Sequence, residues 1–438
     1  MSENTPDAAT EVKCPMNLEE VDLFGPGAQE HWYDAYPILH EEAPVYVLKG
    51  QGLTPGSDGF VLTKHEDISM VVKDPERFPP LMTEAIQEMA ASGVDVETIP
   101  NLNAMQASMV TLRPNMELWR LHKQELTDPW VGPGADRNEE IIRAHANNLI
   151  DTWIDDDEID FIHQFARPLP QHVMASVLGF PLEDIPQLAI WGEAQVKAFV
   201  YGRGHMNQLN EDEIREQFQL LDGFKEYVQQ QVKEKRRNPQ DDMISFLTQV
   251  TYSPLNRKLT DLEVNGVVYA MIIGGLETTQ YALEEQAQLI CEHPGLFEKL
   301  KNDRGLIRQF TEEGMRMRSP TQGLSTRRTS QDEVFQGVKI PAGSVLHLRY
   351  GAANVDPDEF ECPYELRLDR KAVTRHLTFS AGPRVCPGAG ISRIEQQTAW
   401  NLLLDRLEGF EYADGNDFRH QPGIMLGTLN LKLKIKKA

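Results

Sequence analysis

The sequence predicts a mainly α-helical fold with a few small β-sheets, of the α+β class. Apolar residues recur at three- and four-residue spacing over long segments, as they do on the buried face of a helix. Segments of β character are short and are bounded by Pro and Gly turns. The predicted helices span residues 138–154, 211–237, 260–294 and 391–410. The predicted strands span residues 43–48, 59–64, 344–350 and 429–436.

The domain organisation follows from what the 438-residue chain lacks. It has no internal repeat and no Ser-, Gly- or Pro-rich linker, so nothing marks an appended domain. Length alone would also allow about three domains. We expect a disordered amino terminus over residues 1–15 and a single domain over residues 16–438.

The charge balance excludes several classes of partner. Asp and Glu total 67 against 43 Lys and Arg, which gives a formal net charge of −24. This charge repels nucleic acids and anionic membrane surfaces at long range. No basic leader followed by an apolar core occurs, and no stretch of eighteen uncharged apolar residues is present. We therefore expect a cytoplasmic protein that binds neither nucleic acid nor membrane.

Cys386 has a setting that the three other cysteines lack. It precedes Pro387, a favoured first residue of a helix, here predicted over residues 387–405. Free backbone N–H groups and the positive end of the helix dipole stabilise a thiolate at this place. Gly382 and Gly388 carry no side chains, so a bulky flat ligand can approach the backbone. The setting suits a metal ligand; a small buried apolar side chain is the alternative for a lone cysteine.

The segment FSAGPRVCPG over residues 379–388 fits the pattern F-x-x-G-x-R-x-C-x-G. Average composition would give this pattern by chance on the order of 10⁻⁴ times in a chain of this length. The segment resembles the haem-thiolate signature of the cytochrome P-450 superfamily. The resemblance implies the P-450 fold, with haem b (iron protoporphyrin IX) between a long distal helix and the helix that follows the cysteine loop.

The same resemblance implies roles for the residues of this loop. Cys386 would be the axial thiolate on the haem iron, and Phe379 would pack beside the sulfur. Gly388 would allow the haem to approach, and Arg384 and His376 would bind haem propionates. A thiolate ligand favours cleavage of the O–O bond, whereas a histidine ligand would suit oxygen carriage.

A second motif, GGLETTQ, lies at residues 274–280 in the longest predicted helix. Glycines inside a helix cost roughly 1 kcal/mol each, and an acid–threonine pair is out of place in an apolar core. The segment resembles the oxygen-activation motif of the family, with Gly274, Gly275, Glu277 and Thr278 at the matching positions. The resemblance implies that the glycines let the helix widen over the haem, that Thr278 holds the bound oxygen and that Glu277 passes protons. A helix kink with a solvated glutamate is the alternative.

A third motif, Glu-x-x-Arg at Glu313 and Arg316, occurs between the acid–threonine helix and the cysteine. The same spacing recurs elsewhere in the chain, where most such pairs are exposed helix salt bridges. The position of this pair resembles that of the buried Glu–Arg pair of the family. Residues 353–370 resemble the segment that follows it, which implies that Arg367 completes a network holding the cysteine loop.

Further residues resemble propionate-binding positions of the family. Arg327 is the expected arginine, and the adjacent Arg328 is its rival. The segment ELWRLHK resembles a helix with the pattern W-x-x-x-basic that faces the propionates, which implies Trp119 and Lys123. A shift of one residue would choose His122 instead of Lys123.

The resemblance implies a haem monooxygenase that inserts one atom of O₂ into a small, mostly apolar organic substrate. The reaction would be a hydroxylation or an oxidative demethylation of a terpenoid, steroid or aromatic compound. We expect electrons from a separate ferredoxin and an NAD(P)H-dependent ferredoxin reductase, because no reductase segment is fused to the chain. Two alternatives remain: a non-catalytic haem-binding sensor or carrier, which would leave Glu277 and Thr278 unused, and a peroxide-driven relative.

Substrate contacts are expected from three segments, residues 78–111, 197–206 and 321–325. The first is expected to be long, irregular and methionine-rich, and long loops in compact enzymes are often functional. Small residues leave room above the haem, and methionines adapt to irregular shapes. Ordinary surface and core packing is the alternative for each residue. The expected substrate-contacting residues are Met105, Phe199, Gln322, Gly323 and Leu324.

Overall fold

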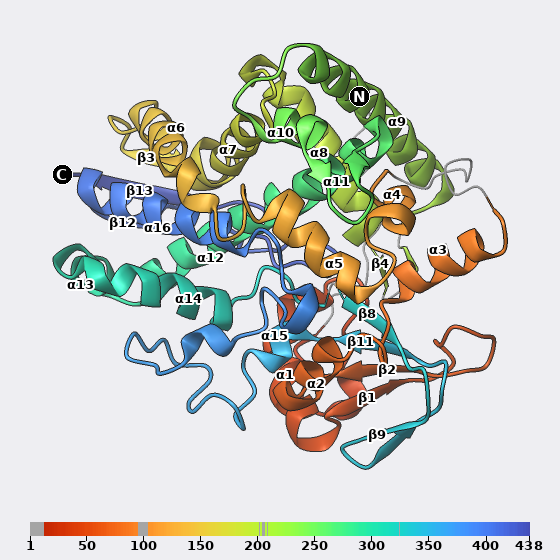
Figure 1. Ribbon diagram of the computed structural model, residues 1–438. Helices are drawn as coiled ribbons and strands as arrows, with labels where there is room; N and C mark the ends of the chain where they lie inside the picture. Colours follow the sequence, from red (N-terminus) through yellow and green to blue (C-terminus); the bar gives the residue numbers. More distant parts are fainter. Residues whose placement is uncertain (1–12, 95–103, 201, 204–205, 208, 324) are drawn as a thin grey trace.

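The computed structural model describes residues 13–94, 104–200, 202–203, 206–207, 209–323 and 325–438. Helices make up most of this part of the chain, and the sheets are small (Figure 1). The predicted mainly α fold with small sheets is confirmed. Of the expected disordered amino terminus, residues 1–12 lie outside the described residues, and Pro15 is buried.

The long helices begin and end where the chain supplies matching caps. Asn210 and Thr260 each form a capping box with the glutamate three residues later. No helix among the described residues is long and apolar enough to cross a bilayer. The main helices are α6 (Glu139–Asp151), α7 (Pro168–Leu178), α8 (Ile185–Val200), α9 (Glu211–Arg237), α10 (Met243–Gln249), α11 (Asp261–Gly275), α12 (Glu277–Glu292), α14 (Ile307–Met317) and α16 (Ala389–Arg406).

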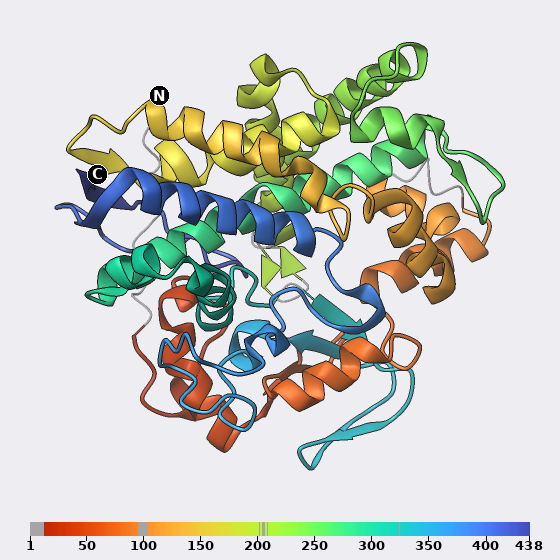
Figure 2. The same ribbon diagram turned by 60° about the vertical axis from the view of Figure 1, so that its left-hand side comes forward.

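One large apolar cluster holds these helices together. Helix α16 packs on α6, α12 and α14, while α11 packs on α7, α9 and α10. Trp400 of α16 is fully buried, and Phe310 of α14 meets it edge-on with ring centroids 5.6 Å apart. Figure 2 shows α16, in blue, running alongside α6, in orange-yellow. The helix that follows the cysteine is thereby fixed on several sides.

The largest sheet has four strands in the order β1 (Val45–Leu48), β2 (Gly59–Leu62), β11 (Val345–Leu348) and β8 (Ser325–Arg328). Strands β2 and β11 are parallel, and the two outer pairs are antiparallel. The sheet lies beside α1 (Trp32–Glu42) and α2 (His65–Lys73), apart from the main helical body (Figure 1). Its register pairs Arg327 with Leu346.

Two of the smaller sheets lie outside the four-stranded sheet. The first is three-stranded, with the order β12 (Leu407–Tyr412), β13 (Lys432–Lys437) and β3 (Glu158–Asp160). The second is a hairpin of β9 (Glu333–Phe335) and β10 (Val338–Ile340).

The expected irregular stretch over residues 78–111 is largely helical, so that expectation is wrong. It contains α3 (Leu81–Ala91) and α4 (Ala104–Leu112), while residues 95–103 lie outside the described part. Ala and Met recur in both segments, with Glu also in α3, and these residues have high helix propensity. Helix α4 packs closely on α11: a Cβ at Gly266 would lie 2.6 Å from the Ala104 carbonyl oxygen.

The predicted helix over residues 260–294 is divided at its glycine pair. Helix α11 ends at Gly275, and α12 begins at Glu277. A Cβ at Gly275 would lie 3.0 Å from the Met174 side chain, so close packing requires this glycine. A Cβ at Gly274 would meet no heavy atom within 4 Å, so this face of the helix is open. The division therefore lies at the acid–threonine motif.

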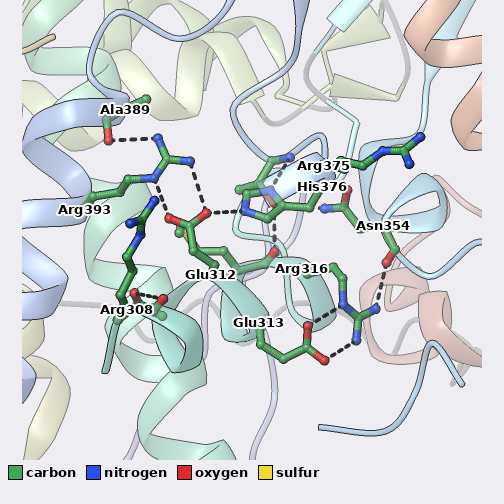
Figure 3. A network of polar contacts seen from close by, with 12 residues as sticks. Arg308, Glu312, Glu313, Arg316, Asn354, Arg375, His376, Ala389 and Arg393 are labelled. Carbon is green, nitrogen blue, oxygen red and sulfur yellow. Dashed lines mark hydrogen bonds and ion pairs between the residues drawn. The ribbon is translucent and has the colours of Figure 1, made fainter. Parts of the chain in front are cut away.

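Glu313 and Arg316 form an ion pair in which both side chains are fully buried. The Arg316 Nε and Nη2 atoms donate to the carboxylate over 2.8 and 2.9 Å (Figure 3). Nη1 donates to the carbonyl oxygens of Asn354, at 2.9 Å, and Pro363, at 2.8 Å. The pair therefore fixes the segment between β11 and the cysteine loop.

Arg370, not Arg367, completes this network. Arg370 Nε donates to the Glu313 carboxylate over 2.9 Å, and its other nitrogens reach three backbone carbonyls. Arg367 contributes its backbone N–H to Glu313, but its side chain is 33% exposed and pairs with Glu361 and Asp369. The expectation for the Arg367 side chain was wrong because the turn that ends in Arg370 directs the later arginine inward.

The two arginines offer a matched test of this assignment. We expect Arg370→Met to lower the free energy of unfolding by about 3 kcal/mol, because it leaves a buried carboxylate with half of its partners. Arg367→Met should change it by less than about 0.5 kcal/mol, as exposed ion pairs contribute little. Denaturant unfolding of both variants measures the difference, and equal losses would contradict the assignment.

Candidate active site

Tight backbone packing shapes the loop that carries Cys386. Gly382 has φ of +70°, and a Cβ there would lie 2.9 Å from the Val72 carbonyl oxygen, so this position requires glycine. The Cys386 N–H donates to the Phe379 carbonyl oxygen over 2.9 Å. Helix α16 follows at Ala389, which places the cysteine at its amino end, as the sequence predicts.

The electrostatics at Cys386 favour a thiolate only in part. Burial raises the pKa of the thiol. The backbone N–H groups of Gly388 and Ala389, together with the cations Lys123 and Arg393, act to lower it. A metal cation bound at the sulfur would supply the charge compensation that burial removes. The donor is therefore suited to an iron ligand.

His376 does not take the propionate-binding role that the sequence suggested. Its Nε2 shares a hydrogen bond of 3.0 Å with Glu312, and its Nδ1 accepts from the Thr378 N–H. Arg393 of α16 donates to the same carboxylate (Figure 3). Although burial favours the neutral acid, these partners hold the pKa of Glu312 at about 2. His376 is thus a structural link between α14, α16 and the cysteine loop.

Phe379 lies beside this network. The Arg393 guanidinium lies 4.5 Å from the centre of its ring, and the His376 ring lies 6.1 Å away. The phenyl ring is half-buried. Phe379 therefore stands between the ionic network and the loop that carries the sulfur.

Two arginines lie over the ring of Trp119, and a third, Arg327, lies near one of them. The guanidinium carbon of Arg384 lies 3.8 Å from the centre of the indole, and that of Arg113 lies 4.3 Å away. Burial, followed by repulsion from Arg327 and Arg113, lowers the pKa of Arg384 to about 9. Burial lowers the pKa of Arg113 to about 10, and it also lowers that of Arg327. Among the described residues, none of the three has an acidic partner.

This cluster fits the carboxylates of a haem. Buried charges are normally paired, so three unpaired cations side by side require an anion. Trp119 Nε1, Arg327 Nε and His122 Nδ1 are also buried without a hydrogen-bond partner. Two propionates would neutralise two of the three charges and accept hydrogen bonds from the buried donors. Arg113 was missed in the sequence because no motif distinguishes it from other basic residues; its burial beside Trp119 identifies it.

The structure separates the rival basic residues. Arg327 is 6% exposed, whereas Arg328 pairs with Glu84 and Glu88. Lys123 does not join the arginine cluster as expected: its Nζ donates to the carbonyl oxygen of Val385, beside the cysteine, over 3.2 Å. It lies one position beyond α5 (Met116–His122), which carries Trp119. Lys123 therefore supports the cysteine loop.

The alternative residue, His122, is 5% exposed. Burial, with the charge of Arg113, holds the pKa of His122 well below its usual value. Its imidazole is therefore neutral beside the arginine cluster.

Glu277 and Thr278 lie at the start of α12. The Thr278 hydroxyl donates to the Gly274 carbonyl oxygen over 2.7 Å, and the Tyr281 hydroxyl donates to the Glu277 carboxylate over 2.6 Å. Burial raises the pKa of Glu277 to about 7, although the hydrogen bond from Tyr281 acts to lower it. A carboxyl with this pKa can both take up and release a proton near neutral pH.

The helices that follow the two motifs are in direct contact. Thr279, next to Thr278, shares a hydrogen bond of 3.1 Å with Ser392, which lies on the first turns of α16 after Cys386. The acid–threonine segment and the cysteine helix are thus in direct contact, although more than a hundred residues separate them in sequence.

The expected substrate residues have different surroundings. Gln322 is fully buried and bonds to Tyr36, Tyr33 and the Ser319 carbonyl, so it is a structural residue and the expectation was wrong. Gly323 is half-buried. Met105 is partly buried against the main core. The Phe199 side chain and Leu324 lie outside the described residues.

An apolar group near the acid–threonine motif was missed in the sequence. It consists of Val196, Tyr281, Ile424 and Met425, with Ile273 packed against it. The Gln322 N–H donates to the Ile424 carbonyl oxygen over 3.1 Å, which holds the carboxyl-terminal loop in place. The short apolar run at residues 424–426, between glycines, was the available signal.

Comparison with known proteins agrees with this geometry. A family model described as Cytochrome P450 matches residues 70–435. The polyketide biosynthesis cytochrome P450 PksS of Bacillus subtilis is 27% identical, over 90% of this chain and 94% of its own length. The biotin biosynthesis cytochrome P450 of the same organism is 29% identical, over 89% and 92%.

Solved structures give the same result. The structure of P450BioI in complex with hexadec-9Z-enoic acid ligated acyl carrier protein has a TM-score of 0.79 at 26% identity, covering 93% of this chain and 99% of that one. The structure of PksS has a TM-score of 0.77 at 25% identity, covering 94% and 99%.

The adjacent arginines of β8 test the anion-binding cluster. Because Arg327 lacks an acidic partner, we expect Arg327→Gln to leave the haem-free protein at least as stable, yet to speed haem loss by about tenfold. Arg328→Gln should change neither quantity appreciably. Haem transfer to an acceptor protein, with denaturant unfolding of the haem-free form, measures both. Equal haem retention in the two variants would contradict the cluster's role.

Proposed function

Because the chain belongs to the cytochrome P450 family, we propose that it inserts one atom of O₂ into a small, mostly apolar organic molecule, by hydroxylation or oxidative demethylation, in the cytoplasm. Residues 16–438 would act as one catalytic unit with haem b. The observation that carries the proposal is the direct contact between the acid–threonine segment and the cysteine helix, through Thr279 and Ser392.

Each part of the site has a distinct task in this reaction. Cys386 would hold the haem iron, and Arg113, Arg327 and Arg384 would hold the propionates. The haem, once bound, supplies the redox chemistry that activates oxygen. The Thr278 hydroxyl can accept and donate a hydrogen bond on the open side of the divided helix.

Glu277 can carry protons toward this hydroxyl because its carboxyl changes charge near neutral pH. Lys197 and Arg167, each about one-third exposed, lie on its solvent side and pair with Glu193. Protons would therefore enter from the surface at α8 and leave toward Thr278.

A terpenoid, steroid or small aromatic substrate is the proposed class. The apolar group of Val196, Tyr281, Ile424 and Met425 supports it, because such surfaces favour apolar ligands. Known relatives are named for different products: one is an epothilone C/D epoxidase from Sorangium cellulosum, and another belongs to polyketide biosynthesis. The proposed substrate class therefore rests on the apolar group of this chain and not on the product of any one relative.

A separate ferredoxin, reduced by its NAD(P)H-dependent reductase, is the proposed electron donor. Lys73, beside Gly382, and Arg120, on the Trp119 helix, are exposed near the cysteine loop. Exposed cations at this face would attract an acidic carrier despite the net negative charge.

A haem-binding sensor or carrier is the second candidate. It would explain Cys386 but would leave the pKa of Glu277 and the Thr278 hydroxyl without a use. A peroxide-driven relative would likewise need no proton delivery. NAD(P)H-driven product formation separates the proposed monooxygenase from both candidates.

The ligand assignment has a direct spectroscopic test. We expect the reduced protein with carbon monoxide to show the long-wavelength absorption of a thiolate-bound haem. Cys386→His should lose this band while keeping some haem, because imidazole replaces the thiolate. Cys362→Ser, at an exposed cysteine, is the control and should keep the band. A band that survives in Cys386→His would refute the assignment.

Adjacent threonines test oxygen activation. In a system reconstituted with ferredoxin, reductase and a substrate, Thr278→Ala should raise the peroxide formed per NAD(P)H consumed by about tenfold or more, because proton delivery loses its hydroxyl. Thr279→Ala removes the contact with Ser392 instead and should cost about 1 kcal/mol of stability while coupling is kept. Full coupling in Thr278→Ala would contradict the role assigned to this hydroxyl, whereas a wild-type protein that forms no NAD(P)H-driven product would favour the sensor or peroxide-driven alternatives.

A further inference from the structure

Tyr281 lies one helical turn after Glu277 on α12 and is 1% exposed. Its hydroxyl donates to Glu277 Oε2 over 2.6 Å. Among the described residues it is the hydrogen-bond donor to this carboxyl. The sequence motif gives no role to this position, and the route proposed for protons does not use the tyrosine.

The Tyr281 ring is held by the carboxyl-terminal loop. A Cβ at Gly427 would lie 2.3 Å from Tyr281 Cε1 and 2.4 Å from Cδ1, so the ring lies directly on the loop backbone. The next residue, Thr428, is bonded to α12 through its N–H, which reaches Glu284 over 3.1 Å. Its hydroxyl also reaches Glu285 over 2.9 Å. The loop and the helix thus clamp the ring in one position.

The other charged groups around Glu277 act less directly. Glu193 and Lys197 face it from α8, and Arg167 faces it from the residue before α7. Lys197 lies 2.7 Å from Glu193, and Arg167 lies 3.6 Å from the same carboxylate. Both cations are therefore engaged with Glu193 at the surface. The buried hydrogen bond from Tyr281 is the contact that can fix where the Glu277 carboxyl points.

We propose that Tyr281 is a positioning residue that holds the Glu277 carboxyl in place and sets the pH range over which it delivers protons. This inference rests on the proposed monooxygenase function. A hydroxyl that donates to a carboxylate stabilises the charged form and lowers its pKa. Without it, the pKa of Glu277 should rise above its present value of about 7, so that the carboxyl keeps its proton to higher pH.

The protonation of Glu277 can be followed in the haem-loaded enzyme without turnover. Infrared difference spectra recorded against pH show the carboxylic-acid C=O stretch, which Glu277→Gln assigns by removing it. We expect the titration midpoint of this band to rise by about one pH unit in Tyr281→Phe. The pH dependence of peroxide release should shift in the same direction.

Two further variants distinguish a positioning role of Tyr281 from a general loss of structure. Tyr227→Phe deletes a similar hydroxyl that donates to Asp184 over 2.7 Å and should leave the Glu277 midpoint unchanged. Gly427→Ala displaces the Tyr281 ring and should raise the midpoint, but it should add nothing in the Tyr281→Phe background, because the hydroxyl is already absent. It also keeps the test open if Tyr281→Phe fails to fold.

Several results would overturn the inference: an unchanged midpoint in Tyr281→Phe, an equal shift in Tyr227→Phe, or no band lost in Glu277→Gln. The thiolate-type carbon monoxide band, measured on the same samples, distinguishes this failure from failure of the proposed function. A variant that keeps the band but not the shift refutes only the role of Tyr281.

Discussion

The geometry of the site depends on two adjacent glutamates of α14 that bind different parts of the chain. Glu313 holds Arg316 and Arg370, and through them the segment that leads to the cysteine loop. Glu312 holds Arg393 of α16 and His376 of the loop itself. Breaking a buried pair leaves an uncompensated charge at a cost of several kcal/mol, so this segment has little freedom. Cys386 is therefore fixed between two ionic networks before any ligand binds.

Where the cofactor would bind, the site instead buries positive charges that have no negative partner. Arg113, Arg327 and Arg384 are buried close together without a carboxylate, so the protein alone bears their desolvation and repulsion. An anionic cofactor removes this cost when it binds, and ligand binding of this kind stabilises the folded state. The two ionic networks fix the cysteine loop, and the unpaired arginine cluster favours binding of the anionic cofactor. The net charge of −24 conceals this local separation of charge.

The sequence predicted the parts of the site that depend on spacing along a single helix or loop. Helix periodicity predicted the main helices, but it predicted one helix over residues 260–294, which is divided into α11 and α12 at the glycine pair. Where two side chains could make the same contact, their spacing in the sequence did not show which of them makes it. Arg370 lies three residues after Arg367, and only the turn between them decides which arginine reaches Glu313. Gln322 was misassigned for a similar reason, since its buried partners Tyr33 and Tyr36 lie nearly 290 residues away.

Among the described residues, Glu277 forms a hydrogen bond with Tyr281 but no ion pair, and this difference from Glu312 and Glu313 matches its task. Proton delivery requires a carboxyl that changes charge, and a strong ion pair like that of Glu312 would hold its pKa too low for this purpose. Glu277 instead has burial, which raises its pKa, and one tyrosine hydroxyl, which limits the rise. That tyrosine rests on the same loop that carries Ile424 and Met425. The residues that would contact substrate and the group that would supply protons therefore share one support.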